Sequence, residues 1–229
     1  MNRNIQISAG PDAGWGFTVI IYGHNNGNVT RIGHANLKGV QFTNGGQYDS
    51  LNAPLRFWNT INGNYTSSVT QTTFMNCSAS CVYIKNAHNL TFSDNVLYNA
   101  YVFGVQITQV LSLTFTNNVI IGVSDKPTMA AGSELVACVY VEEEITNTSN
   151  TVVKDNYCMG STQHGFAVPF TRCDNLMGNP IANNTVGSAK IGFIINTIGQ
   201  QCQAFSYAKA FACQIGQICG PPGIKMIKF

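Results

Sequence analysis

The stretch LTFTNNVIIG (Leu113–Gly122) decides the fold, because it nearly repeats LTFSDNVLYN (Leu90–Asn99), which starts 23 residues earlier. Both stretches contain Leu-Thr-Phe, then a pair of small polar residues, then an apolar triplet. A motif that returns at such an interval is typical of repeat proteins, in which each repeat stacks on its neighbours.

The polar pair recurs along the chain after short apolar stretches. Its members are Asp94-Asn95, Asn117-Asn118, Asp155-Asn156 and Asn183-Asn184, and TTFMNC (Thr72–Cys77) resembles an earlier unit with Asn76 in the pair position. A second series of apolar or alternating segments follows the pairs, with the members CVYI, GVQI, CVYV, GFAV and GFII, which begin at Cys81, Gly104, Cys138, Gly165 and Gly192. Each unit therefore offers three short strands separated by turn residues.

This pattern predicts an all-β chain that folds as a right-handed parallel β-helix with three short strands per rung. Neighbouring rungs of such a coil pair at ~4.8 Å, so that like residues stack in columns. Stacked amides would form an asparagine ladder along the axis. Its expected members are Asn76, Asn95, Asn118, Asn156 and Asn184.

The coil is expected to occupy residues 1–204. Two longer stretches, Asp125–Leu135 and Phe170–Asn179, are interpreted as loop insertions, which on solenoids often form the contact surface. Residues 205–229 are interpreted as a C-terminal capping or exit segment, with a short helix expected around Phe205–Cys213.

The composition excludes some classes of function. Hydrophobic residues make up 45% of the 229 residues and charged residues only 10%, against ~25% charged in ordinary soluble domains. The 26 Asn residues favour turns. The twelve Lys and Arg are scattered and the net charge is +2, so nucleic acid is not an expected partner. No run approaches the ~18 apolar residues of a membrane span, so we expect none in this segment.

The cysteines and glycosylation motifs indicate a secreted glycoprotein. Eight cysteines is an even number and high for a cytosolic chain. The chain also has six Asn-x-Ser/Thr motifs, at Asn28, Asn64, Asn76, Asn89, Asn147 and Asn183. The first residues lack the apolar region of a signal peptide, so we expect a fragment of a larger chain.

Disulfides are expected rather than a zinc site, because no CxxC has a second CxxC or a His pair. Free buried thiols are the alternative. Two expected bonds, Cys77–Cys81 and Cys213–Cys219, would close small loops. Cys173–Cys202 would tie the second insertion to the following rung, and Cys138–Cys158 remains by elimination.

Several longer stretches together span about Met1 to Phe205: NRNIQISAGPDAGWGFTVIIYG, GHANLKGVQFTNGGQ, DNVLYNAYVFGV, NNTVGSAKIGFII and DNYCMGSTQHGFAVP with the downstream Cys173. They resemble the parallel β-helix region of fibrocystin and fibrocystin-like proteins, the polycystic kidney and hepatic disease type. These are large receptor-like membrane proteins of ciliated cells, with relatives in ciliates and other protists. The resemblance implies an extracellular or cell-surface role, associated with cilia, and no cofactor.

An enzyme that cuts acidic polysaccharides is the alternative, because β-helices are a common scaffold for such enzymes. Asp94 and Asp155 would lie two rungs apart in one column, roughly 9–10 Å from each other, which is near the upper limit for an inverting pair. Corner residues that favour turns are the other interpretation of these two aspartates. His164 could be a base or a packed, hydrogen-bonded residue, and Glu142, Glu143 and Glu144 could hold a cation or end a solvated strand.

Trp15 and Trp58 could stack on sugar rings or pack in the core or at an end of the coil. Taken together, the residues favour a non-catalytic structural or adhesion module. Its expected partners are other domains or copies of the same protein, in a filament or larger assembly, and extracellular glycans or matrix. An open coil end invites such stacking, because it exposes unpaired backbone.

Overall fold

The computed structural model describes most of the 229 residues. The described residues are 5–10, 15–25, 27, 30–47, 50, 52–60, 65–127, 135–142, 151–171, 181–197, 205–219 and 225–227. All of its regular elements are β-strands. No helix in this part of the chain is long and apolar enough to cross a membrane.

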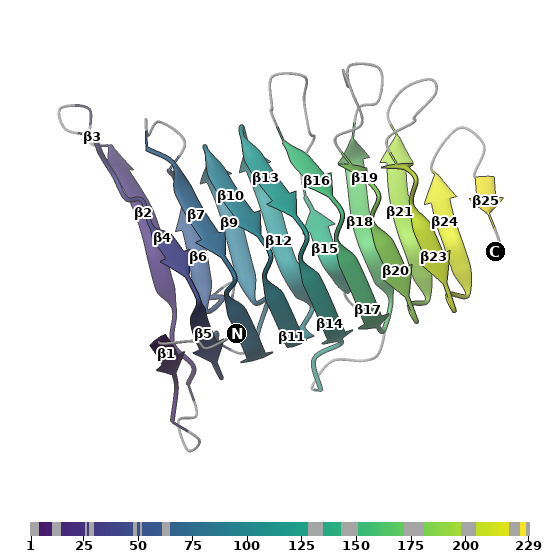
Figure 1. Ribbon diagram of the computed structural model, residues 1–229, viewed down its shortest axis with the longest axis horizontal. Coiled ribbons are helices and arrows are strands. Elements are labelled where there is room, and N and C mark those ends of the chain that lie inside the picture. The colour runs from purple at the N-terminus through teal and green to yellow at the C-terminus, as the bar shows by residue number, and fades with distance from the viewer. Residues whose placement is uncertain are drawn as a thin grey trace.

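The strands form three sheets that run along one axis (Figure 1). The chain visits them in a fixed order in every turn, and we call them the first, second and third sheet in that order. The first sheet contains β4 (Asn36–Lys38), β7 (Ser67–Thr70), β10 (Leu90–Ser93), β13 (Leu113–Thr116), β16 (Val152–Lys154), β19 (Ile181–Ala182) and β22 (Phe205–Ser206). The second sheet contains β1 (Ile5–Ser8), β5 (Val40–Thr43), β8 (Thr73–Cys77), β11 (Val96–Tyr101), β14 (Val119–Ser124), β17 (Tyr157–Ser161), β20 (Thr185–Gly187) and β23 (Lys209–Phe211).

The third sheet contains the longest strands of the coil. Its parallel members are β2 (Val19–Asn25), β6 (Leu55–Trp58), β9 (Val82–Ala87), β12 (Phe103–Val110), β15 (Ala137–Val141), β18 (His164–Thr171), β21 (Ile191–Thr197) and β24 (Ile215–Cys219). Two short strands, β3 (Thr30–Ile32) and β25 (Lys225–Ile227), pair antiparallel with β2 and β24 at the two ends. The third sheet is therefore closed at each end by a hairpin strand.

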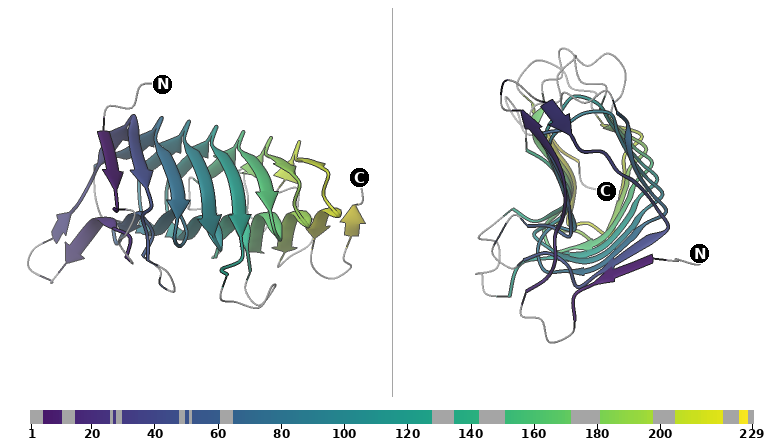
Figure 2. Two further views of the ribbon diagram at one scale, coloured as in Figure 1. Left: turned by 90° about the horizontal axis from the view of Figure 1, so that it is seen from below. Right: turned by 90° about the vertical axis from the view of Figure 1, so that its left-hand side faces the viewer.

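Each turn of the coil pairs in parallel with the next, so the predicted parallel β-helix is confirmed. In the first sheet, Leu90 is opposite Leu113 and Phe92 is opposite Phe115, which is why LTF repeats in the sequence. Figure 2 shows the turns stacked side by side and, in the end view, the sheets arranged around a common interior. The expected insertion Asp125–Leu135 lies between β14 and β15, whereas Phe170–Asn179 begins inside β18, which includes Phe170 and Thr171.

The interior is filled by columns of apolar side chains. Phe92 stacks on Phe115 with ring centroids 5.3 Å apart, and Phe42 stacks on Phe74 at 4.9 Å. All of these rings are almost completely buried. Because the side chains of alternate residues in a strand point to opposite faces, every second residue faces this interior and its neighbours face outward.

The C-terminal part continues the coil instead of forming the expected helix. The prediction of a helix around Phe205–Cys213 is wrong, because this stretch contains β22 and β23, which pair in parallel with β19 and β20. The strand β24 likewise pairs in parallel with β21. Residues 205–219 therefore add another turn, in which each short strand is specified by the strand it lies on rather than by local helical preference.

A buried asparagine ladder runs along the corner between the first and second sheets. Asn95, Asn118, Asn156 and Asn184 are each at most 1% exposed. Each amide nitrogen of Asn95, Asn118 and Asn156 donates to the side-chain oxygen of the next ladder member at 3.0 Å. The same nitrogens also donate to a backbone carbonyl, as Asn118 does to Phe92 at 3.1 Å. The ladder thus satisfies polar groups that would otherwise be buried without a partner.

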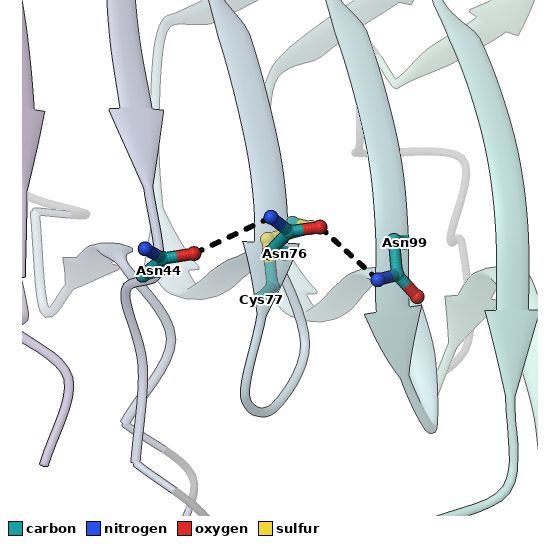
Figure 3. The surroundings of a disulfide bond; sticks show 5 residues. Asn44, Asn76, Cys77 and Asn99 are labelled. Carbon is teal, nitrogen blue, oxygen red and sulfur yellow. Dashed lines mark hydrogen bonds between the residues drawn. A yellow bond between two sulfur atoms is a disulfide. The ribbon is translucent and has the colours of Figure 1, made fainter. Parts of the chain in front are cut away.

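Asn76 does not belong to this ladder, so that part of the prediction is wrong. Thr72 occupies the equivalent position, and its backbone N–H donates to Asn95 Oδ1 at 2.9 Å. Asn76 lies in a second, exposed ladder at the far end of the second sheet, where it donates to Asn44 at 3.3 Å and accepts from Asn99 at 3.1 Å (Figure 3). The prediction aligned TTFMNC with LTFSDN, so that Phe74 would lie in the first sheet opposite Phe92. In the structure Phe74 lies in the second sheet opposite Leu97.

Two of the expected disulfides are present. Cys77–Cys81 closes the corner between β8 and β9, and Cys138–Cys158 joins two consecutive turns, with Cα atoms 5.2 and 6.0 Å apart. The prediction of a Cys213–Cys219 disulfide is wrong, because Cys213 is a free cysteine. The extended strand β24 separates these two residues by more than the ~7 Å that a disulfide spans. Cys173 and Cys202 lie outside the described residues.

Candidate ligand-binding surface

The three sheets present chemically different outer faces. The exposed aromatic and aliphatic side chains Tyr98, Ile121 and Tyr157 lie on the second sheet. The outer positions of the first sheet carry Ser68, Thr91 and Thr114 in register. Charged and aromatic side chains combine on the side of the third sheet that faces away from the interior, where Ile20 and Tyr22 are exposed but Arg56, Tyr83, Gln106 and Thr108 are buried.

Two adjacent columns make up the outer face of the third sheet. Leu55 and Phe57 point into the core, so the alternating Arg56 and Trp58 lie on the opposite side. One column contains Ile20, Arg56, Tyr83, Gln106, Tyr140, Ala167 and Ile194. The other contains Tyr22, Trp58, Lys85 and Thr108, and Glu142 follows β15 in the same column.

Arg56 is held between two aromatic rings. Its guanidinium carbon lies 4.5 Å from the centroid of Trp58 and 5.4 Å from that of Tyr83. Its Nη1 donates to Asn52 Oδ1 at 2.5 Å, while its buried Nε has no hydrogen-bond partner among the described residues. Burial lowers the pKa of this guanidinium, and the nearby Tyr83 opposes that shift. Stacking on aromatic faces partly compensates a buried cation.

The aromatic series continues toward the start of the coil. Tyr22 packs edge-on against Trp58 at 6.2 Å, and His24 lies 6.4 Å from Tyr22. Tyr22 is 47% exposed, whereas Trp58 is half-buried. Two aromatic side chains on successive turns therefore form a continuous surface that solvent reaches from one side.

A carboxylate lies at the other end of the same columns. Glu142 Oε2 accepts hydrogen bonds from Thr108 Oγ1 at 2.6 Å and from Gln106 Nε2 at 3.2 Å. Burial, with a contribution from Glu142, raises the pKa of Tyr140, and the Tyr140 ring stacks on Phe103 at 4.6 Å. This carboxylate is thus fixed by neutral donors. Glu143 and Glu144 lie outside the described residues.

Asp94 and Asp155 lie two turns apart in one column at the ladder corner, as expected, with Asn117 in the turn between them. All three residues have positive φ, between 56° and 58°, a conformation that Asn and Asp tolerate better than other non-glycine residues. This explains the polar pair, since its first member needs a left-handed backbone and its second member forms the ladder.

His164 is packed at the start of β18, where it aligns with Ala137 and Ile191. Its Nδ1 lies 3.0 Å from the Val136 carbonyl oxygen. Burial lowers the pKa of His164; the Val136 hydrogen bond opposes this and Lys190 adds to it. The structure therefore shows it as a packed, hydrogen-bonded residue.

The remaining candidates lie apart. Trp15 is 74% exposed near the start of the coil, whereas the rings of Tyr22 and Trp58 contact each other further along. No group of three or more His, Cys, Asp or Glu side chains among the described residues could hold a metal ion. Of the six glycosylation motifs, Asn76 and Asn183 are exposed, Asn89 is half-buried, and the other three asparagines lie outside the described residues.

Sequence reasoning missed that Arg56, Lys85, Tyr22 and Tyr83 lie on the same side of neighbouring strands. They belong to different units of the sequence, separated by 27 to 36 residues along each column. Aligning the alternating outer positions of VIIY, LRFW and VYIK would have brought them together. The turns of this part of the coil were recognised less clearly, because their corner residues depart from the polar-pair motif.

Comparison with known proteins agrees with the architecture. A family model described as a right-handed beta helix region matches residues 59–206. The chain therefore belongs to the right-handed β-helix family. Neither the comparison with curated proteins nor that with solved structures gave a match.

Proposed function

We propose that this chain is a non-catalytic structural and adhesion module of a fibrocystin-like protein at the cell surface, associated with cilia. In this role the coil supplies length and stiffness and presents its outer faces to neighbouring domains, to copies of itself in a filament, or to extracellular glycans. The family-specific part rests on the stretches of sequence that resemble fibrocystin, among them GSTQHGFAVP (Gly160–Pro169).

The observation that best supports a structural role is the disulfide Cys138–Cys158, which links consecutive turns of the coil. Cys138 and Cys158 are both completely buried and join β15 to β17. Beside this bond, the ladder of Asn118 and Asn156 ties the same turns. A disulfide persists in oxidising compartments such as the cell exterior, and a coil fastened in two ways at one level resists bending and unwinding.

The polar groups of the third sheet support binding rather than turnover. Its carboxylate, Glu142, already accepts two hydrogen bonds from neutral donors. Cleavage of a glycosidic bond by hydrolysis uses two carboxyl groups facing one sugar, and Asp94 and Asp155 lie at the corner between the first and second sheets, on different strands from Glu142.

The proposal is tested by isolating the protein from its native source and measuring its intact mass before and after glycosidase and reductant. We expect attached glycans and at least two disulfides. A bare, fully reduced chain contradicts the extracellular assignment. A second assay incubates the protein with hyaluronan, pectate and alginate, with and without calcium, and no new reducing ends or unsaturated products are expected.

The second candidate function is a carbohydrate-active protein, either sugar-binding or polysaccharide-cleaving. The observation that favours it is the contact of the exposed Tyr22 with the half-buried Trp58, beside Arg56 and Lys85. Turnover of any of the three polysaccharides that is lost in Asp94→Asn or Asp155→Asn would overturn the non-catalytic assignment. Binding without turnover agrees with both the adhesion module and a lectin-like protein.

A further inference from the structure

We propose that the outer face of the second sheet binds a second copy of this chain, so that two coils lie side by side with these faces in contact. The inference names the partner for the adhesion role proposed above and rests on that role. It makes the association lateral, because the contact runs along the coil instead of across its ends.

The outer face of the second sheet carries two columns of apolar side chains. Because Leu97 and Ile120 fill the core, the residues that alternate with them point outward, and the strands that bear them lie side by side, as Figure 1 shows for β11, β14 and β17. One column contains Met75, Tyr98, Ile121, Met159, Gly187 and Phe211, and the other contains Val96, Val119 and Tyr157. Tyr98 is 46% exposed, Tyr157 51% and Phe211 49%. Single apolar side chains are ordinary on a surface, whereas a continuous patch marks a contact site.

The glycine does not interrupt the longer column. A Cβ on Gly187 would lie 2.4 Å from the Phe211 ring and 2.7 Å from the sulfur of Met159. These two side chains, from the neighbouring strands β23 and β17, therefore cover the glycine. The apolar surface extends without a gap over the six strands from β8 to β23.

This face carries almost no charge. Beyond Tyr157 the second column continues with Thr185 and Lys209, and this lysine is the only charged residue at the described positions of either column. The chain has a net charge of +2, so two copies repel each other weakly. A charged partner would find no counter-ion here, whereas an identical uncharged face is complementary. At its edge, Asn76 and Asn99 of the exposed ladder supply the polar rim that surrounds the apolar centre of an interface.

The spacing of the two columns favours a copy of the chain over an unrelated apolar partner. Within a column the side chains repeat every ~4.8 Å, and the columns lie ~6.6 Å apart, since two residues of a strand separate them. The columns therefore form parallel ridges with a groove between them. A partner keeps its own ridges in such a groove over several turns when it has the same repeat, as a second coil does. Two sheets that pack face to face in this way lie ~10 Å apart.

The area of the face suits a reversible dimer. Six strands spaced by ~4.8 Å, with two columns of side chains ~13 Å across, cover roughly 400 Å² in projection. Because the side chains add relief to this flat area, two such faces together bury on the order of 1,000 Å², which is the low end for a specific complex. We therefore expect the dimer to exchange with the monomer at micromolar or higher concentrations.

The ends of the coil are less suited to a second copy than this face. The strands β3 and β25 run antiparallel at the two ends of the third sheet, which has the longest strands. The third sheet of another copy could continue the parallel pairing only after these strands had moved, since they occupy the sheet edges. Lateral contact through the second sheet requires no such rearrangement.

Sedimentation equilibrium of the full chain from about 1 μM to about 0.5 mM, a range that covers weak and moderate dimers, tests the inference. The chain is produced in a secreting eukaryotic host, so that disulfides and glycans form. We expect a reversible equilibrium between monomer and dimer. Sodium sulfate should strengthen the dimer, as it does apolar association, and sodium chloride should not weaken it, because no charge pair holds it together.

Variants of Ile121 locate the contact. This residue lies near the middle of the longer column, where a two-fold axis brings it close to its counterpart in the other copy. Ile121→Lys should weaken the dimer about tenfold or more, because it places two like charges in the desolvated centre of the interface. Ile121→Glu should do the same, and an equal mixture of the two variants should associate again, since the charges are then opposite.

The matched control is Thr114→Lys, which adds the same charge at an exposed position of the first sheet in the same turn of the coil. This variant should dimerise as the parent does. Ile121 is 36% exposed and points away from the core, so its substitutions should leave the fold intact, and circular dichroism establishes that each variant is folded.

The outcomes are distinguishable. A chain that stays monomeric over the whole range overturns the inference, and so does a dimer that Thr114→Lys weakens as much as Ile121→Lys does. Failure of the mixed variants to associate overturns it as well. Binding to phosphatidylcholine vesicles that Ile121→Lys abolishes, without a dimer in solution, overturns it in favour of a lipid surface. None of these results bears on glycans or disulfides in the native protein, so failure of the inference remains separate from failure of the extracellular assignment.

Discussion

The side chain of Asn118 lies directly on that of Asn156, one turn further along the coil. Two groups of Asn118, its backbone N–H and its Nδ2, donate to the Oδ1 of Asn156 at 2.9 and 3.0 Å. In turn, Asn118 Oδ1 accepts from the N–H and the Nδ2 of Asn95 at 3.1 and 3.0 Å. One amide therefore satisfies groups in three successive turns, and its removal affects all of them.

Replacement of a ladder amide should be costly. Asn118→Ala leaves the N–H and Nδ2 of Asn95 and the carbonyl of Phe92 without this partner in the buried interior, and each unsatisfied buried group costs ~1–3 kcal/mol. We expect a loss of ~3 kcal/mol or more in urea unfolding. The control is Asn99→Gly in the exposed ladder, where a glycine already occupies the next turn at Gly122; a similar loss there would argue against a special role for the buried ladder.

The corner conformation should discriminate between substitutions at Asp94. Its φ is 58°, so Asp94→Asn should change the stability by no more than ~0.5 kcal/mol, whereas the β-branched Asp94→Val should cost ~1–3 kcal/mol. Thermal and urea unfolding of the two variants measure the difference. Equal stabilities would mean that the backbone at this corner is not strained.

Glycines in the third sheet should be sensitive when they face the interior. A Cβ on Gly104 would lie 2.6 Å from both the Cys138 carbonyl oxygen and the Ile120 side chain, so Gly104→Ala should lower the stability by ~2 kcal/mol or more. Gly122, with φ of 70° and no close neighbour, should accept asparagine. Gly122→Asn extends the exposed ladder by one turn, and its unfolding midpoint should equal or exceed that of the parent.

The buried disulfide should contribute to stability, while the free thiol should not. The double variant Cys138→Ala and Cys158→Ala removes the link between consecutive turns and should cost ~2–4 kcal/mol. Cys213, which donates to the Phe211 carbonyl oxygen at 3.4 Å, has no disulfide partner, and Cys213→Ala should differ from the parent by less than ~1 kcal/mol. Non-reducing unfolding of both variants provides the comparison.

The stability should depend on pH through His164. Burial lowers its pKa below the ordinary value of 6.5, so the unfolded chain binds the proton more readily than the folded one. The neutral imidazole stabilises the fold fully above pH 6.5, and this contribution is lost as the pH falls through the folded-state pKa. The parent should therefore lose stability relative to His164→Gln as the pH falls below about 6.5. Parallel unfolding curves for the two proteins across this range would contradict it.

Much of the coil could be predicted from the sequence, because its central turns follow one template. Asn95, Asn118, Asn156 and Asn184 stack as expected, and the pairs Cys77–Cys81 and Cys138–Cys158 form. Asn76 was misplaced, since both Thr72 and Asn76 follow a short apolar stretch and only the register of β8 against β11 decides between them.

The outer surface was harder to predict than the interior. Interior columns repeat the same residue types, because each turn must fill the same space. Outer columns carry no such requirement, so Arg56, Lys85 and Tyr22 give no repeated letter to recognise. Their proximity follows from pairing across turns, and this pairing depends on loop lengths that local patterns do not specify.

Identical pairing between turns also bears on how such a molecule can change in size. The strands β10 and β13 pair in the same way with the strands before and after them. Duplication of one complete turn would therefore preserve the pairing of its neighbours and lengthen the β-helix by ~4.8 Å. Insertion or deletion of part of a turn would instead shift the register of the strands, so that the side-chain columns no longer align. The length of this β-helix can therefore change in evolution only by complete turns.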